Sequence, residues 1–431
     1  MTVRDSQQGI FLERDRILSC VHCGLCLPAC PTYIATSDEN DSPRGRIYLM
    51  RAVQESKLDA DSSTFRRHID RCLGCRACES ACPSGVEYGH LLEAARINVE
   101  AARPMGIAAS VKRFTLRQIW PYDGRRRWMM LTGRALRASG INRLLIASRV
   151  IKFFSPVADT ALKLLEAARP AKLRITSSAP ADTKVERKGT ASIFKGCVAD
   201  LQPSVSAAVE RVLQVNGFDT CSPRSQACCG ALHAHAGFLE DARALARRNI
   251  DAFAGTAGPV VTSAGGCGAM LVDYGPLLSD DPEYRDRAIE FARRVNDIGE
   301  VLREPRLLVV TTDGERVVYD ASCHLLHGQH AADGSLGMLT ALEGLAIAPL
   351  QHPDVCCGGA GIYNLLEPEL SGAVLERKVQ DILASGATVV ATANVGCHMQ
   401  ISYGLQRAGA STVRVCHPVE ILEQCYNAAE L

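Results

Sequence analysis

Two runs of four cysteines near the start of this 431-residue chain constrain its fold more than any other feature. Each run has the spacing C-x2-C-x2-C-x3-C followed by proline, with Cys20, Cys23, Cys26 and Cys30 in the first and Cys72, Cys75, Cys78 and Cys82 in the second. Such tight spacing wraps three thiolates around one face of a 4Fe-4S cube, and the fourth thiolate reaches a second cube. We therefore predict one cluster on Cys20, Cys23, Cys26 and Cys82, and another on Cys72, Cys75, Cys78 and Cys30.

Zinc explains these runs less well, because a zinc site usually uses two C-x2-C pairs rather than two runs of four. Between the runs, residues 42–56 predict a helix that begins at "SPRGR". Arg44 and Arg46 at its start are either solvated residues or cations that stabilise a reduced, more negative cluster.

The cysteine count points to metal throughout the chain. There are 19 cysteines, and all except Cys221, Cys416 and Cys425 fall into regular patterns. Structural disulfides do not persist in a reducing compartment, so this number of thiols indicates metal binding. The three exceptions are expected to be inert. The polar start of the chain has no apolar core of signal-peptide length, which predicts a cytoplasmic protein.

Charge and hydropathy exclude two classes of partner or location. The 48 Lys+Arg and 47 Asp+Glu leave a formal net charge of +1, so no global attraction to nucleic acid is expected. The longest apolar stretch, residues 141–154, is interrupted by Arg143, Arg149 and Lys152. It is well short of the ~20 residues that a membrane-spanning helix needs, so we expect no transmembrane segment.

The second half of the chain is predicted to be a duplicated unit. The first copy contains Cys197, the adjacent pair Cys228 and Cys229, and Cys267; the second contains Cys323, the pair Cys356 and Cys357, and Cys397. Each landmark of the second copy follows its counterpart by 126 to 130 residues. The same landmarks in the same order at a nearly constant offset indicate an internal repeat.

In both copies, short β-rich runs such as "ASIFKGC" and "GPVVTSAGGC" end at a cysteine, and helical stretches lie between them. This alternation predicts parallel α/β units, in which ligands bind beyond the carboxyl ends of the strands. Each adjacent pair precedes a glycine. Because neighbouring side chains of an extended strand point to opposite faces, the pair can serve one site only if the chain turns there.

The sequence thus predicts a multidomain α/β protein. A mainly helical, ferredoxin-like two-cluster domain over residues 1–95 is followed by a helical, basic connector and linker over 96–190. Two tandem cysteine-rich CCG repeats occupy residues 191–315 and 316–431. The linker itself is predicted from the Pro, Ser and charged residues of 174–190.

Other candidate residues are a basic segment and two groups of histidines. Residues 111–137 interleave arginines with Trp120 and Trp128, which favours either a membrane-surface or acidic-partner contact or a solvated connector. His233 and His235 follow the first CCG, and we interpret them as core or surface histidines. His324, His327 and His330 have helical spacing after Cys323 and are candidates for the border of a quinone or protein site.

The CCG pairs, with a cysteine some thirty residues before and another some forty after, resemble the repeats in the cysteine-rich subunit of heterodisulfide reductase and its relatives. Together with the two ferredoxin motifs, the stretches "CVHCGLCLPACPTY", "SPRGRIYLM", "CCGALHAHAG" and "TANVGC" are similar to the family of iron-sulfur subunits of bacterial glycolate oxidase. Sister families in lactate utilisation and in anaerobic glycerol-3-phosphate oxidation share the repeats. The resemblance spans essentially the whole chain.

One departure affects the expected metal. In the heterodisulfide reductase pattern the last cysteine belongs to a C-x2-C pair, but this chain has Ala264 and Asn394 at those positions. Each copy keeps four cysteines, which suit an ordinary 4Fe-4S cluster or a zinc ion rather than a five-ligand cluster. A copy that binds nothing and serves as scaffold is the third possibility.

No glycine-rich fingerprint for a flavin, nicotinamide or nucleotide is present. Oxidation of a 2-hydroxy acid delivers hydride, which iron-sulfur clusters do not accept directly. The sequence therefore predicts a non-catalytic electron-transfer subunit. The resemblance implies flavin-binding dehydrogenase partners for glycolate, a membrane quinone or similar acceptor, and a place in the cytoplasm or on the cytoplasmic face of the inner membrane. Subunits for L-lactate or glycerol-3-phosphate oxidation, a self-contained thiol/disulfide reductase, and a non-redox scaffold are the alternatives.

Overall fold

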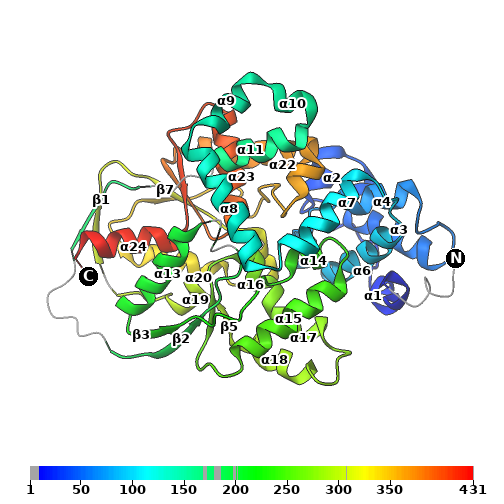
Figure 1. Ribbon diagram of the computed structural model, residues 1–431, viewed down its shortest axis with the longest axis horizontal. Helices are drawn as coiled ribbons and strands as arrows, with labels where there is room; N and C mark the ends of the chain where they lie inside the picture. The colour runs from blue at the N-terminus through cyan, green and yellow to red at the C-terminus, as the bar shows by residue number, and fades with distance from the viewer. Residues whose placement is uncertain are drawn as a thin grey trace.

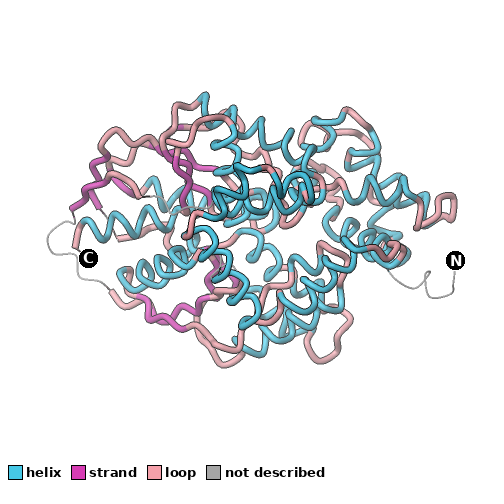
Figure 2. The backbone as a smooth tube through the Cα atoms, turned by 45° about the horizontal axis from the view of Figure 1, so that its top comes forward, coloured by secondary structure: helices cyan, strands magenta, loops and turns pink. Residues whose placement is uncertain are grey.

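The computed structural model describes residues 9–167, 172–178, 186–197, 200, 202–306 and 308–430. The N-terminal helices lie at one end of an elongated molecule, and the two repeats extend from them, one below and one above in the view of Figure 1. The strands gather in the half of the molecule away from the N-terminal helices, as Figure 2 shows.

The N-terminal module is helical, as predicted. It comprises the 3-10 turns η2 (Gly9–Leu12) and η3 (Glu39–Asp41) and the helices α1 (Arg14–Leu18), α2 (Pro31–Thr36), α3 (Pro43–Gln54), α4 (Ser63–Asp70), α5 (Ala77–Ser80) and α6 (Tyr88–Ala101). Helix α3 begins where the sequence indicated, because the Ser42 hydroxyl accepts a hydrogen bond from the Gly45 N–H and Pro43 occupies the first turn. Its apolar face packs with Phe65, Ile69 and neighbouring side chains into a small core.

A string of helices connects this module to the repeats. It consists of α7 (Ile107–Phe114), the π-turn η4 (Thr115–Ile119), α8 (Asp123–Ala138), α9 (Ile141–Ser148), α10 (Val150–Phe154) and α11 (Pro156–Ala167). Helices α9 and α10 form the top of the molecule in Figure 1. Among the described residues, no helix combines the length and the apolar character needed to cross a bilayer.

The linker prediction is wrong for Ile175–Ser178. These residues form β1, which pairs antiparallel with β6 (Leu308–Thr312), and β6 in turn pairs with β8 (Leu342–Glu343). The backbone of this segment hydrogen-bonds to a neighbouring strand, so its polar composition does not make it a free spacer. The middle of the predicted linker, residues 179–185, lies outside the described residues.

The two repeats are built on equivalent four-stranded parallel sheets. The first contains β2 (Gly189–Ile193), α13 (Pro203–Val215), β3 (Phe218–Cys221), α14 (Ala231–Ala234), α15 (Leu239–Phe253), β4 (Val260–Thr262), α16 (Gly265–Val272), α17 (Tyr274–Leu277), α18 (Arg285–Arg294), β5 (Val295–Asp297) and α19 (Ile298–Val301). The second contains β7 (Val317–Asp320), the π-turn η5 (His324–Gly328), α20 (Ala332–Thr340), β9 (Ile347–Ala348), α21 (Tyr363–Leu366), α22 (Pro368–Ala384), β10 (Val389–Thr392), α23 (Val395–Arg407), β11 (Arg414–Cys416) and α24 (Pro418–Ala428).

The strand orders confirm the duplication. The orders are β3-β2-β4-β5 and β9-β7-β10-β11, so the first, second, third and fourth strands of each unit occupy the same places. Ile193 pairs with Val261 in one sheet and Val317 with Val389 in the other. One continuous core contains buried side chains from both sheets and from α13 and α24, so the repeats are fused rather than separate.

Asp297 lies at the seam between the repeats. Its side chain caps α19 by accepting a hydrogen bond from the Gly299 N–H at 2.9 Å, and it also accepts one from the Ser335 hydroxyl at 3.2 Å. Burial raises the pKa of this carboxyl from its ordinary 3.8 to about 7. Between these two pKa values, the folded protein therefore retains a proton that the unfolded chain releases.

We predict that this carboxyl makes the protein less stable as pH rises from about 4 to 7, by up to ~1.4 kcal/mol per pH unit. Asp297→Asn should flatten the dependence, because the amide does not titrate. Thermal unfolding midpoints at pH 5 and pH 8 would measure it, with Asp286→Asn, at an exposed aspartate, as the control. Equal pH dependence in wild type and Asp297→Asn would contradict the prediction.

Candidate metal centres

The structure brings the N-terminal cysteines together in the two predicted sets. In the first set Cys20, Cys26 and Cys82 are half-buried and Cys23 is exposed. Burial raises the pKa of Cys20, and the charges of the nearby Cys82 and Cys23 raise it further. The cysteine that ends the second run thus lies with the start of the first run, and this set opens to solvent.

The second set surrounds a cavity. Cys30, Cys72, Cys75 and Cys78 all line it and are all buried. Several donors point at these sulfurs: the Gly74 N–H lies 3.4 Å from Cys72 Sγ and the Tyr88 hydroxyl 3.6 Å from the same atom. Burial raises the pKa of Cys78, and the neighbouring thiolates at Cys75, Cys72 and Cys30 raise it further.

The two arginines at the start of α3 have different environments. Arg46 is fully buried and lines the same cavity as the second cysteine set. Burial alone would lower the pKa of its guanidinium, but the charges of Cys72, Tyr88, Cys30 and Asp41 outweigh that effect and raise it. Arg44 is partly exposed and pairs with Glu39 at 2.6 Å. Burial raises the pKa of the nearby Cys26, and the backbone N–H of Arg44 opposes this rise.

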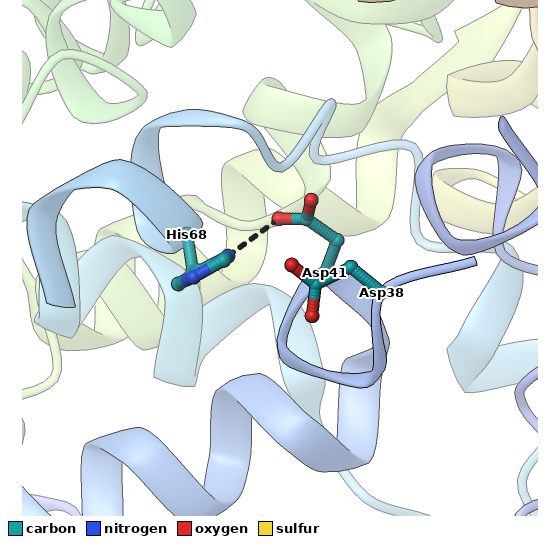
Figure 3. Close-up of side chains that lie close together, drawn as sticks. All are labelled: Asp38, Asp41 and His68. Atoms are coloured by element: carbon teal, nitrogen blue, oxygen red, sulfur yellow. Dashed lines mark hydrogen bonds and ion pairs between the residues drawn. The ribbon is translucent and has the colours of Figure 1, made fainter. Parts of the chain in front are cut away.

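A network of charges holds Arg46 in place. Asp41, which is fully buried, contacts the Arg46 guanidinium at 3.4 Å, His68 Nδ1 at 2.8 Å and Arg71 at 3.0 Å. Figure 3 shows Asp41 beside His68, with Asp38 on the same turn. Within the described chain, only Asp38, Asp41 and His68 bring three potential ligand atoms within 4.8 Å of one another. Because Asp41 already faces two arginines, this group is a structural ion-pair network.

In each repeat the adjacent cysteines divide between two partners. In the second copy, Cys356 Sγ lies 3.9 Å from Cys323 Sγ, and Cys357 Sγ lies 3.1 Å from Cys397 Sγ. In the first copy, Cys228 Sγ lies 3.8 Å from Cys197 Sγ, and Cys229 interacts with Cys267. All eight are buried. The pair therefore joins the first and last cysteines of its repeat into one set of four.

The glycine after each pair makes this arrangement possible. Gly230 has φ +92° and Gly358 has φ +78°, a left-handed conformation that other residues rarely adopt. The Gly358 N–H then lies 3.4 Å from Cys356 Sγ. In the first copy, hydrogen bonds from the neighbouring thiols lower the pKa of Cys228, and the Gly230 N–H lowers it further. The turn aims a backbone donor at the first sulfur of the pair and leaves the second free to face the other partner.

The remaining cysteines lie at the carboxyl edges of the sheets, as expected. Cys197 and Cys323 follow β2 and β7, while Cys267 and Cys397 lie in the first turns of α16 and α23, directly after β4 and β10. At the position where a further cysteine is missing, the Asn394 amide donates a hydrogen bond to Cys397 Sγ at 3.3 Å. The counterpart Ala264 offers no such donor.

The repeats differ in the charge beside their thiols. Lys378 on α22 is fully buried and pairs with Asp320 at 2.8 Å. Burial alone would lower its pKa, but Asp320 and then the thiols of Cys357 and Cys397 raise it. On the equivalent helix α15, the neutral Asn249 binds the loop that carries the pair, through Ala227 N at 2.7 Å and the Cys228 carbonyl at 3.0 Å. The second copy therefore has a buried lysine near its sulfurs where the first copy has an asparagine.

The second repeat directly adjoins the second N-terminal cysteine set. Cys75, Cys323 and Cys356 belong to one buried cluster with Tyr363. The Tyr363 hydroxyl donates to the Arg71 carbonyl at 2.9 Å. Burial raises the pKa of Cys75, and Cys323 is the next largest cause. A continuous series of thiol groups thus leads from the exposed Cys23 into the second repeat, which sequence spacing did not indicate.

The candidate histidines divide into three environments. His233 is a buried core residue, as interpreted, and its Nε2 lies 2.6 Å from the Leu116 carbonyl. His235 is half-buried, and it pairs with Glu93 at 3.2 Å and stacks on His324 with ring centroids 5.7 Å apart. His327 contacts the Ser80 hydroxyl at 2.8 Å.

The prediction that three histidines share a face is wrong for His330. The π-turn η5 ends at Gly328, and His330 is exposed with φ +57°, so helical spacing does not continue to it. A π-turn inside a short apolar segment has no sequence signal of its own, which is why spacing alone misplaced this residue.

Several basic side chains of the segment 111–137 form ion pairs with acidic side chains of the same chain. Lys112 and Arg113 pair with Glu100, and Arg126 pairs with Asp200 at 2.8 Å. The connector interpretation accounts for these charges. The apolar side chains of the adjoining helices remain exposed, with Trp128 at 70%.

The three cysteines outside the patterns are packing residues. Cys416 and Cys425 are fully buried in the core shared by the repeats. Cys221 lies 3.3 Å from the Ser192 hydroxyl.

The residues fit iron-sulfur clusters. Burial raises the pKa of thiols such as Cys75 and Cys78, because an apolar interior favours the neutral thiol over the thiolate. A bound cation reverses this preference by stabilising the thiolates that ligate it. In a tetrahedral zinc site all four sulfurs lie about 3.8 Å apart. Among the described residues no three cysteine sulfurs come within 4.8 Å of one another, but single pairs within the repeats lie 3.1 to 3.9 Å apart, so the spacing in the repeats suits either metal.

This combination defines an iron-sulfur electron-transfer protein, and comparison with known proteins agrees. Residues 16–86 match the family model of the 4Fe-4S dicluster domain, and residues 191–272 and 317–402 match the cysteine-rich domain. Together these domains indicate iron-sulfur clusters.

Several relatives align with this chain. A probable glycolate oxidase iron-sulfur subunit of Bacillus subtilis (strain 168) is 36% identical over 431 residues, 96% of both chains. The glycolate oxidase iron-sulfur subunit of Escherichia coli (strain K12) is 33% identical over 434 residues, 98% of both chains. Lactate utilization protein A of Shouchella clausii is 34% identical over 236 residues, 54% of this chain and 97% of the relative. The chain belongs to the family of glycolate oxidase iron-sulfur subunits.

We predict that both repeats bind metal in the full-length, anaerobically prepared protein. Cys228→Ser and Cys356→Ser should each remove the metal of one copy and leave the N-terminal clusters intact, because each sulfur belongs to one set only. Iron and zinc per chain, with electron paramagnetic resonance of the reduced protein, would measure this. Cys221→Ser is the matched control. A folded variant with unchanged metal content would show that its repeat is scaffold.

Proposed function

We propose that this chain is the iron-sulfur electron-transfer subunit of a multi-subunit flavoprotein dehydrogenase for a 2-hydroxy acid, most simply glycolate oxidised to glyoxylate. It relays electrons from a partner flavin to a quinone-type acceptor and is not catalytic alone. The observation that carries this proposal is the continuous series of cysteine sets from the exposed Cys23 through the buried cavity to Cys323 and Cys356.

In this proposal Cys20, Cys23, Cys26 and Cys82 hold one 4Fe-4S cluster, and Cys72, Cys75, Cys78 and Cys30 hold another. Bound clusters supply one-electron carriers. The chain's own residues set their surroundings. Arg46 places a buried positive charge at the second set, the N–H of Gly74 and the Tyr88 hydroxyl approach Cys72, and the buried position of this set excludes water.

The four cysteines of each repeat form the third and fourth proposed sites. Cys197, Cys228, Cys229 and Cys267 make up one, and Cys323, Cys356, Cys357 and Cys397 the other. The match of both repeats to the cysteine-rich domain supports iron-sulfur clusters in them. The proposed domain boundaries, 1–95, 96–190, 191–315 and 316–431, follow these sites, with β1 joining the connector to the repeats.

The first cysteine set also offers a surface for a partner. Large apolar side chains are exposed around Cys23: Val21 at 68%, Leu25 at 59% and Tyr48 at 65%. Exposed apolar groups gathered at one site mark protein interfaces. The flavin-binding subunit is the natural occupant, because an electron from its flavin must reach an accessible carrier.

The relatives that align with nearly the whole chain carry the glycolate name, whereas those with the lactate name align with about half, 54%. This difference supports glycolate over L-lactate. Glycerol-3-phosphate oxidation and a self-contained disulfide reductase are the competing functions.

A second exposed surface favours contact with the cytoplasmic face of a membrane. Phe153 and Phe154 at the tip of α10 are 85% and 79% exposed, and Leu144 on α9 is 71% exposed. Arg149 and Lys152 lie exposed beside them. Apolar side chains flanked by cations are typical of helices that lie on an anionic lipid surface.

We predict that replacing Cys26 or Cys78 with serine stops electron flow to a quinone analogue in the reconstituted complex. Flavin reduction by glycolate should continue, because hydride transfer to the flavin does not involve this chain. Stopped-flow flavin bleaching and steady-state acceptor reduction measure the two separately, with Cys221→Ser as control. Full acceptor activity in the variants would show that the clusters do not lie on the electron path and would leave this chain a scaffold role.

We also predict that Phe153→Ser with Phe154→Ser weakens binding to phosphatidylglycerol vesicles at least about tenfold, since each buried Phe side chain is worth ~1.5–3 kcal/mol. Co-sedimentation would measure the bound fraction. Leu366→Ser, at a residue that is 57% exposed on the second repeat, is the control. Unchanged binding in the double variant would place the membrane contact elsewhere or exclude it.

A further inference from the structure

A pocket lies at the junction of the N-terminal module and both repeats, between α6, α16 and η5. We call it the junction pocket. Its lining includes Gly74, Gly266 and His324. These residues are the immediate neighbours of Cys75, Cys267 and Cys323 in the chain. Three of the four proposed metal sites therefore adjoin one pocket.

The pocket presents hydrogen-bonding groups to an occupant. Its walls include His235, which pairs with Glu93 at 3.2 Å and stacks on the His324 ring. The Nε2 atom of His324 is buried and makes no hydrogen bond within the described structure. Apolar side chains such as Leu92 and Met270 complete the lining.

The charges of the pocket limit what can bind. Arg76 is already held by Asp273 at 2.7 Å and by Glu79 at 2.6 Å. The acidic groups of the wall are Glu93 and Asp273, the partners of His235 and Arg76, and no unpaired cation is added to them among the described lining residues apart from the titratable His90. A nucleotide or other phosphate-bearing carrier would face these carboxylates, so an uncharged ligand is favoured. At Gly266 an added Cβ would meet only Asn394 Oδ1, at 3.9 Å, so the backbone there is open to a flat ring.

We propose that the junction pocket binds the ring of a quinone-type acceptor, with His324 Nε2 and the His235–Glu93 pair on its carbonyl oxygens. The proposal rests on the proposed electron-transfer function. The quinone gains two electrons, delivered singly by the subunit's iron-sulfur carriers, and two protons from solvent through the polar wall, and leaves as the quinol. Each carrier loses one electron per transfer and so returns to its oxidised form.

The test uses the full chain prepared anaerobically and a fluorescent quinone analogue, heptyl-hydroxyquinoline N-oxide, whose emission is quenched on binding. His235→Ala should raise its dissociation constant about tenfold, the loss expected for one hydrogen-bonding contact with a charged pair. Gly266→Leu should abolish binding, because a Cβ there meets only Asn394 Oδ1, at 3.9 Å, and the larger side chain extends into the pocket. His352→Ala, at an exposed histidine outside the pocket, should bind as wild type.

Iron content and circular dichroism show whether each variant is folded and loaded. A photoreactive azidoquinone provides a measurement that needs no variant. It should label peptides that contain Glu93 or His235, and excess unlabelled quinone should prevent the labelling.

Unchanged affinity in folded Gly266→Leu, or labelling confined to other peptides, would overturn the proposal. So would displacement of the analogue from wild type by a small disulfide but not by a quinone, which would assign the pocket to disulfide chemistry. Electron flow from the flavoprotein to ferricyanide, a soluble one-electron acceptor, separates the two hypotheses. If that flow persists while quinone binding fails, the relay stands and only the pocket is wrong.

Discussion

The structure depends above all on the burial of thiols in sets of four. A buried thiolate is costly unless a cation compensates it, and several together repel one another. The charge of the buried thiolates is compensated by backbone N–H groups from left-handed glycines, by the buried Arg46 and Lys378, and by the capacity to bind metal. Helices, sheets and the fused core hold these compensating groups at fixed positions around the sulfurs.

The two repeats meet the same constraint differently. They share strand order, cysteine placement and the turn after the pair, which is what a duplication retains. The second copy adds the buried Lys378–Asp320 pair and the Asn394 donor, and its Cys323 and Cys356 share a buried cluster with Cys75 of the N-terminal module. The duplicated units have therefore diverged into two sites with different charged groups beside their thiols.

Local patterns predicted most of the fold. The cysteine runs, the strands ending at cysteines and the cap of α3 at Ser42 are short-range features, and the structure has all of them. Predictions failed where a distant partner decided the outcome. The segment Ile175–Ser178 is polar and its composition is typical of a linker, but β6 supplies its hydrogen bonds. Nothing in the local sequence distinguishes His235, and its position is defined by its contacts with the distant residues Glu93 and His324.

The sequence by itself predicted the sets of sulfurs, and it determined the sharp turn after each pair and the lack of a flavin fingerprint, because spacing and backbone conformation are local properties. Only the tertiary structure decided that Arg46 is buried beside the second set, that the second repeat rather than the first adjoins it, and that three cysteine sites meet at one pocket. Those facts depend on how modules far apart in the chain pack together. Packing responds to the summed shape and burial of whole surfaces, which no single motif encodes.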